Sequence, residues 1–117
     1  MRGTLASGGD QQEAHLNNLI GKYVIVRSSP SGVWAGTLTA MNGNQVEMAD
    51  ARRLWRWWSA EGVSLSGVAA KGLHPKKTKE CRIALPVAAV IVNEICEVLL
   101  ATEEAKASIE AQEALAG

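Results

Sequence analysis

Residues 23–48 read YVIVRSSPSGVWAGTLTAMNGNQVEM, and this stretch decides the fold because it alternates apolar, strand-like runs with turn residues. β-Branched residues fill the first run, and the Ser, Pro and Gly cluster over 28–32 predicts a turn after it. Asn42 and Gly43 are typical of a hairpin turn before the last run. We therefore predict strands over 23–27, 33–41 and 45–48. Short successive strands joined by tight turns favour a strongly bent antiparallel sheet or a small barrel.

The next stretch places three tryptophans among three arginines. Residues 51–58 read ARRLWRWW, and we expect them to form a fourth strand. Alternation along a strand predicts one face with Leu54, Arg56 and Trp58, and an opposite face with Arg53, Trp55 and Trp57. Because each face carries an aromatic ring and a guanidinium, we expect this run to contact something beyond its own domain.

Capping signals predict three helices around these strands. A capping-box pattern predicts a short helix over 10–20. Ser64 is expected to cap a second helix that ends near Gly72. Thr102, followed by two glutamates in the first turn, is expected to cap a C-terminal helix.

The remaining stretch is rich in Val and Ile, and this composition favours strands at about 81–85 and 89–100. The expected fold is therefore β-rich α+β, a bent antiparallel sheet or barrel of the Sm or SH3 type with an N-terminal and a C-terminal helix. We expect a flexible arm over 1–9, one β-rich domain over 10–101, and a helix over 102–117 that packs on the domain or on a neighbour.

The composition is that of one folded domain, since 47% of the 117 residues are hydrophobic and 21% are charged. The net charge is zero, but residues 20–80 hold nine basic against four acidic residues, and residues 81–117 hold two against six. Opposite charges of the two parts would suit either head-to-tail attraction between copies or packing within one subunit.

Cys81 and Cys96 lie in apolar sequence without a CxxC motif, so we expect two buried thiols and no zinc site. The first ten residues lack the apolar core of a signal peptide, and no stretch is long and apolar enough to span a bilayer. These features predict a protein made in a cytoplasm and not bound to a membrane.

Two resemblances cover parts of the chain. The first rests on Leu19, Ile20, Gly21, Lys22, Val24, Val26, Gly32, Gly36, Thr37 and Leu38, which resemble the first motif of the Sm-like and SH3-like small barrels. That resemblance implies an N-terminal helix leading into a bent five-stranded sheet.

The second resemblance covers nearly the whole chain after Gly21. Its motifs are residues 23–27, 31–33, 35–36, Ala51 to Trp55 with Trp57, Ser64 to Ser66 with Ala69 and Gly72, Cys81, Pro86, and Thr102 and Glu103 with Lys106. This pattern is similar to a family of small phage and prophage proteins of unknown function. Arg56 stands where a tyrosine is usual in that family, and Trp58 is extra. The resemblance implies a phage origin and no known activity.

The sequence offers little for catalysis. His15 and His74 have no acidic partner at triad or metal-ligand spacing, and no phosphate-binding glycine motif occurs. We therefore predict a non-enzyme without a cofactor or a metal ion. Glu94 and Glu97 could form a carboxylate pair, but solvated charges beside an apolar strand are the simpler interpretation.

Tryptophan and arginine dominate the centres of many protein interfaces, and this favours a role in assembly. The candidate interface or binding residues are Trp34, Arg52, Arg53, Trp55, Arg56, Trp57, Trp58, Ser64 and Ser66. We expect a non-catalytic, phage-encoded assembly protein, a minor or decorating component of the virion, that forms a homo-oligomer and contacts other phage structural proteins.

Two alternatives stay open for the same residues. Arginines could meet phosphates while tryptophans stack on bases, in a phage accessory protein that binds nucleic acid or a nucleotide, for example a host defence signal. The zero net charge counts against general nucleic-acid binding. Alternatively, the run covers its own core, with arginine stems lying over the rings.

Overall fold

The computed structural model describes residues 18–60 and 64–114. The arm predicted over 1–9 lies outside these residues, as does most of the helix predicted over 10–20. The first described segment is a turn that includes Gly21, which has a φ of 85°. The Gly21 amide donates to the carbonyl of Leu38 at 2.7 Å, and this bond holds the turn against the sheet.

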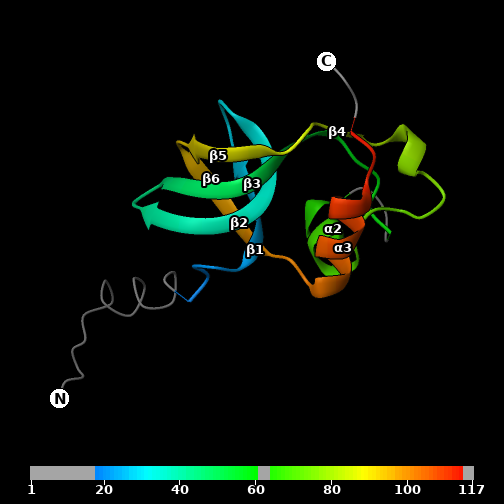
Figure 1. The fold of residues 1–117 in the computed structure, drawn as a ribbon, viewed down its shortest axis with the longest axis horizontal. Helices are drawn as coiled ribbons and strands as arrows, with labels where there is room; N and C mark the ends of the chain where they lie inside the picture. Colours follow the sequence, from blue (N-terminus) through cyan, green and yellow to red (C-terminus); the bar gives the residue numbers. More distant parts are fainter. Residues whose placement is uncertain (1–17, 61–63, 115–117) are drawn as a thin grey trace.

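Six strands form one antiparallel sheet (Figure 1): β1 Tyr23–Ser28, β2 Gly32–Asn42, β3 Gln45–Arg56, β4 Arg82–Ile83, β5 Val87–Val92 and β6 Ile95–Leu100. The hydrogen-bonded order is β4-β3-β2-β1-β6, and β5 pairs with the first half of β3. The β-rich α+β class is confirmed. The expectation of a barrel is wrong, because β5 pairs with β3 and β6 with β1, and no ladder among the described residues joins β5 to β6.

Strand β1 is buried on both faces, and it separates two hydrophobic clusters. Tyr23 and Ile25 belong to the helix-side cluster, which also comprises Val33, Ala35, Leu54, Leu65, Val68, Ala69, Leu73, Cys81, Ile83, Ala101, Ala105 and Ile109. Val24 and Val26 belong to the inner cluster, with Leu38, Val46, Met48, Ala51 and Val92. Burial on both faces explains why the first run of the sequence is apolar at consecutive positions.

The third and fourth predicted strands are one strand, β3. Asp50 has a φ of 50°, and the register between β2 and β3 shifts there, as in a β-bulge. The bulge bends β3, so that Val46 to Ala51 pair with β5 while Leu54 and Arg56 pair with β4. The expectation of a break before the tryptophan run is therefore wrong, because a bulged strand continues through it.

The long strand predicted over 89–100 is two strands, β5 and β6, joined at Asn93 and Glu94. Glu94 has a φ of 56°, which lets the chain turn without a glycine. The Asn93 carbonyl accepts a bond of 2.6 Å from Ser28 Oγ, and its side-chain oxygen accepts one of 2.6 Å from Gln45 Nε2. The β5–β6 connection therefore bonds both to the end of β1 and to the start of β3.

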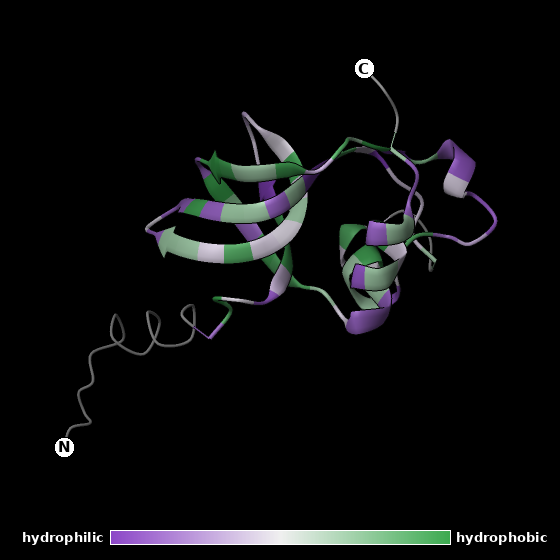
Figure 2. Cartoon of the chain, in the orientation of Figure 1, coloured by the Kyte–Doolittle hydropathy of each residue, from purple (hydrophilic) through white to green (hydrophobic). Residues whose placement is uncertain are grey.

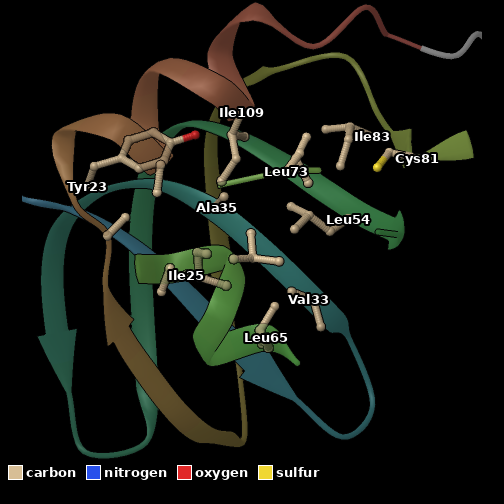
Figure 3. Packing of buried hydrophobic residues seen from close by; sticks show 14 residues of the cluster. Tyr23, Ile25, Val33, Ala35, Leu54, Leu65, Leu73, Cys81, Ile83 and Ile109 are labelled. Carbon is tan, nitrogen blue, oxygen red and sulfur yellow. The ribbon is translucent and has the colours of Figure 1, made fainter. Parts of the chain in front are cut away.

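Both helices in the described part of the chain begin where their caps predict. In α2 (Leu65–Lys71), Ser64 Oγ accepts from the Gly67 amide at 3.0 Å. In α3 (Glu103–Ala111), Thr102 Oγ1 accepts from the Ala105 amide at 3.0 Å. Both helices and the 3-10 turn η1 (Thr78–Glu80) lie on one side of the sheet. Figure 3 shows their apolar residues meeting those of β1, β2 and β3, so α3 packs on its own domain.

The two cysteines differ in burial. Cys81 is buried in the helix-side cluster, as expected. Cys96 is exposed on β6, where its thiol lies 3.3 Å from the Arg27 carbonyl. The expectation that both thiols are buried is wrong for Cys96, because its strand lies at an edge of the sheet.

Candidate binding surface

A group of aromatic and cationic side chains centres on Arg53. Its guanidinium carbon lies 3.7 Å from the centroid of the Trp55 ring and 5.9 Å from that of Trp34. The Arg53 and Trp34 backbones are directly opposite in β3 and β2. Stacking of a guanidinium on an exposed indole contributes about 0.5–1 kcal/mol and fixes the orientation of both groups.

The β1–β2 turn supports this stack. Gly32 has a φ of 82°, and a Cβ at this position would lie 2.9 Å from Arg53 Nη2. The Trp34 indole nitrogen donates to the Ser31 carbonyl at 3.0 Å, so the ring is anchored to the same turn. Glycine is therefore favoured here by the left-handed backbone, and it also leaves space for the end of the Arg53 side chain.

A bulge near the end of β3 brings further charge to this side of the sheet. The register between β3 and β4 shifts between Leu54 and Arg56, and Arg56 lies opposite Arg82. Leu54 and Ile83 point into the helix-side cluster, so Arg56 and Arg82 face the other side, with Trp55. The expected sharing of a face by Leu54 and Arg56 is wrong, because the bulge interrupts strict alternation.

We call this set the Trp55 surface: Trp34, Arg53, Trp55, Arg56 and Arg82. Trp55 is 60% exposed, and both Arg56 and Arg82 are exposed. None of its three arginines forms an ion pair with a residue in the described part of the chain, whereas Arg27 pairs with Glu97 at 3.7 Å. Two like charges opposite each other on neighbouring strands repel, so a bound anionic group would stabilise this arrangement.

Arg52 does not belong to the Trp55 surface, although it is the neighbour of Arg53. It is only 5% exposed, on the helix-side face. Its Nε donates to the Ala84 carbonyl at 2.8 Å, and its Nη1 donates to the carbonyls of Ile109 and Gln112 at 2.7 and 2.8 Å. These bonds satisfy carbonyls at the end of α3, so Arg52 joins the helix to the sheet.

The other predicted interface residues lie away from the Trp55 surface. Trp57 and Trp58 follow the end of β3 and pack against the helix-side cluster. Lys77 Nζ lies 4.2 Å from the centroid of the Trp58 ring. Ser64 caps α2, and Ser66 is exposed on that helix. The structure thus brings together Trp34, Arg53, Trp55 and Arg56, and separates them from the remaining five.

Arg82 and Gly32 are the members of the site that sequence reasoning missed. Arg82 lies 26 positions after Arg56, and only the pairing of β3 with β4 brings the two together. The positive φ of Gly32 was recognisable from its turn-like sequence, but its contact with Arg53 was not.

An open cavity of about 390 Å³ lies beside Arg52, with Tyr23, Asp50 and Glu110 in its wall. Tyr23 is buried, and its hydroxyl has no hydrogen-bond partner among residues 18–60 and 64–114. Burial, followed by the charge of Glu110, raises the pKa of Tyr23 to about 12, against a smaller lowering by Arg52. A phenol with this pKa stays protonated at neutral pH and is a poor general base.

Residues 18–60 and 64–114 offer neither a metal site nor a membrane-spanning helix. No group of three His, Cys, Asp or Glu side chains in these ranges could hold a metal ion. Within the same ranges, every helix is too short or too polar to cross a membrane.

Comparison with known proteins places the whole Trp55 surface inside one family domain. No curated protein matches the chain. The model of a domain of unknown function, DUF6948, matches residues 21–109, which include all six strands and most of α3. By this match over most of its length, the chain belongs to the DUF6948 family.

Proposed function

We propose that this protein is a non-catalytic binding protein that joins a larger protein assembly through the Trp55 surface. The observation that carries the proposal is a large ring left 60% exposed yet held in place by Arg53 at 3.7 Å. A rigid aromatic side chain loses little conformational entropy on binding and buries a large apolar area. Tryptophan and arginine are also the residues that contribute most at interface centres.

The charges around Trp55 define the kind of partner. Arg53, Arg56 and Arg82 present three guanidinium groups without a carboxylate partner among the described residues. A protein surface with an apolar pocket for the ring and acidic residues at its rim would complement them. The guanidinium fork favours carboxylates that accept two hydrogen bonds.

We further propose that the assembly is a phage particle, in which the protein is a minor or decorating component and is itself oligomeric. The resemblance of the sequence to small phage and prophage proteins supports this setting. Mass spectrometry of purified virions of the encoding phage tests it. Peptides of this chain at a constant ratio to the major capsid protein are expected, and their absence from the particle would end this part of the proposal.

Trp55→Ala tests the surface itself. Truncation of a central interface tryptophan typically weakens binding by 2 kcal/mol or more, about a thirtyfold loss of affinity. We therefore expect particles that carry far fewer copies of the variant, with unchanged expression and a loss of stability below about 1 kcal/mol. Ile20→Ala is the matched control, since Ile20 is an exposed apolar residue outside the Trp55 surface. Equal incorporation of the two variants would contradict the proposal.

A second candidate function is binding of a nucleotide or a single-stranded nucleic acid. The observation that favours it is the apposition of Arg56 and Arg82, beside an exposed ring on which a base could stack. Fluorescence anisotropy of a labelled oligothymidylate, with unlabelled ATP as a competitor, tests this function. Salt-dependent binding that Arg82→Gln weakens and Lys76→Gln leaves unchanged would favour it over protein binding. The absence of binding at low salt would exclude it.

A further inference from the structure

Strand β5 is an edge strand that carries none of the usual protection. It pairs with β3 along one side, without a register shift, and no described strand lies along its other side. Residues 84–92 contain no charged side chain. Exposed edges are usually blocked by charges, prolines or bulges, because their free amides and carbonyls recruit other strands. Pro86 precedes β5, so every residue of the strand has a backbone amide, and the amides that point away from β3 are available at the free edge.

The side chains of β5 also form an apolar row on the face of the strand that points away from the inner cluster. Val90 and Val92 pack on the inner cluster, while Val87, Ala89 and Ile91 alternate with them and are exposed. The exposed fraction is 40% for Val87 and 58% for Ile91. Figure 2 shows β5 in hydrophobic colours along its length. An uncovered apolar row beside a free strand edge is typical of an interaction surface.

The charges of the three edge strands indicate which partner suits β5. When a strand pairs antiparallel with its own copy across a two-fold axis, the residues near the axis, in the middle of the strand, come close to their own copies. Self-pairing of β6 would bring its Glu97 near a second carboxylate, and β4 consists of only Arg82 and Ile83. Among the edges of the described sheet, β5 alone has no charge that would oppose self-pairing.

We propose that β5 pairs antiparallel with β5 of a second copy, about a two-fold axis near Ala89. The pairing would satisfy the free backbone groups of both strands and extend two sheets into one. It would also place Val87 of each strand opposite Ile91 of the partner strand, so the two apolar rows would pack side by side. This surface is separate from the Trp55 surface, because β5 pairs with the first half of β3 and Trp55 lies near the end of the second.

Light scattering after size-exclusion chromatography, over a range of loading concentrations, tests the proposal on the full chain. We expect a dimer that dissociates on dilution. Ala89→Lys places two ammonium groups near the axis and should raise the dimer dissociation constant about tenfold or more. The matched control is Ala107→Lys, which adds the same charge at an exposed alanine of α3 and should leave the dimer intact. Trp55→Ala should also remain dimeric, which separates this proposal from the proposed function.

Three results would overturn the proposal. They are a wild-type protein that stays monomeric at high concentration, a dimer that Ala89→Lys does not weaken, and a ring or filament in place of a dimer. If Ala89→Lys does not fold, amide hydrogen exchange of the wild-type protein gives an independent answer. Amides of β5 that point away from β3 should exchange more slowly as concentration rises. Exchange rates that do not change with concentration would show that the edge is free.

Discussion

Two neighbouring arginines near the end of β3 lie on opposite faces of the strand and make different contacts. Arg52 is buried, and its guanidinium donates three hydrogen bonds to backbone carbonyls. Arg53 lies on the opposite face, stacked on the exposed ring of Trp55. The first arginine connects elements of the fold, and the second helps to shape a surface. Residue type alone therefore does not separate a structural arginine from a binding one.

The tryptophans divide in the same way. Trp58 packs against the helix-side cluster with Lys77 over its ring, whereas Trp55 is exposed on the other side of β3. Changes on the helix-side face should therefore lower the free energy of unfolding, and changes on the Trp55 surface should alter binding. The following predictions test this division, from the largest expected effect on stability to the smallest.

Arg52→Ala should be as damaging as any of these changes. It removes three hydrogen bonds and leaves the carbonyls of Ala84 and Ile109 without this donor. We expect a loss of about 3 kcal/mol in the free energy of unfolding, measured by urea denaturation. Arg53→Ala is the control and should cost about 0.5–1 kcal/mol. Similar losses for the two variants would contradict the division between the faces.

Alkaline pH should destabilise the protein through Tyr23, its only tyrosine. The pKa of this phenol is about 12 in the folded protein, against a reference value of 10.0. The stability that it contributes is therefore complete below pH 10 and is lost as the pH rises from 10 to 12. The loss should reach about 2–3 kcal/mol, and tyrosinate absorbance should appear together with unfolding.

Tyr23→Phe isolates the contribution of this phenol to the pH dependence of stability. The variant removes a buried hydroxyl that has no hydrogen-bond partner in the described part of the chain, so it should be at least as stable as the wild type at neutral pH. Its stability should fall less steeply above pH 10. A wild-type tyrosine that ionises near pH 10 without unfolding would show that Tyr23 is accessible to water.

Gly32→Ala should have a smaller effect, because it strains one turn and displaces the end of one side chain. We expect a cost of about 1–2 kcal/mol, measured by thermal denaturation. Gly21→Ala is the matched control, since Gly21 has nearly the same φ but nothing within 4 Å of an added Cβ. The difference between the variants reports the contact with Arg53. Equal costs would show that the stack contributes nothing to stability.

Trp55→Ala should affect stability least, by less than about 1 kcal/mol, because its ring is mostly exposed and its main contact is Arg53. Trp58→Ala should cost about 3 kcal/mol, because it removes a ring that packs on the helix-side cluster. Calorimetry of the two variants measures this contrast. If Trp55→Ala were the more destabilising change, the Trp55 surface would be part of the core.

The sequence predicted those parts of the fold that depend on local signals. Turn residues and β-branched runs located β1 and β2, and capping residues located the starts of α2 and α3. It missed the bulge at Asp50 and the turn at Glu94, where residues other than glycine adopt a positive φ. Sequence reasoning expects glycine at such positions, so neither break in the strand pattern was visible.

The candidate site was predicted in part. Most of its residues stand close together in the sequence, but their arrangement in space depends on pairing with distant segments. The tryptophan and arginine run pointed to Arg53 and Trp55. The same run gave no sign that Arg52 reaches the end of α3, which lies 57 residues away in the chain at Ile109. It also gave no sign of Arg82, whose place depends on the pairing of β3 with β4.

The connection at Asn93 has a consequence for the order of folding. Its bonds to Ser28 and Gln45 span 65 and 48 residues of chain. Loop closure over such distances is slow compared with the formation of the β1–β2 and β2–β3 hairpins, which are local. We therefore expect the first three strands to assemble early and the Asn93 connection to close late. Until β5 pairs with β3 and β6 pairs with β1, their edges stay open, and we expect the molecule to be most prone to aggregation at this stage.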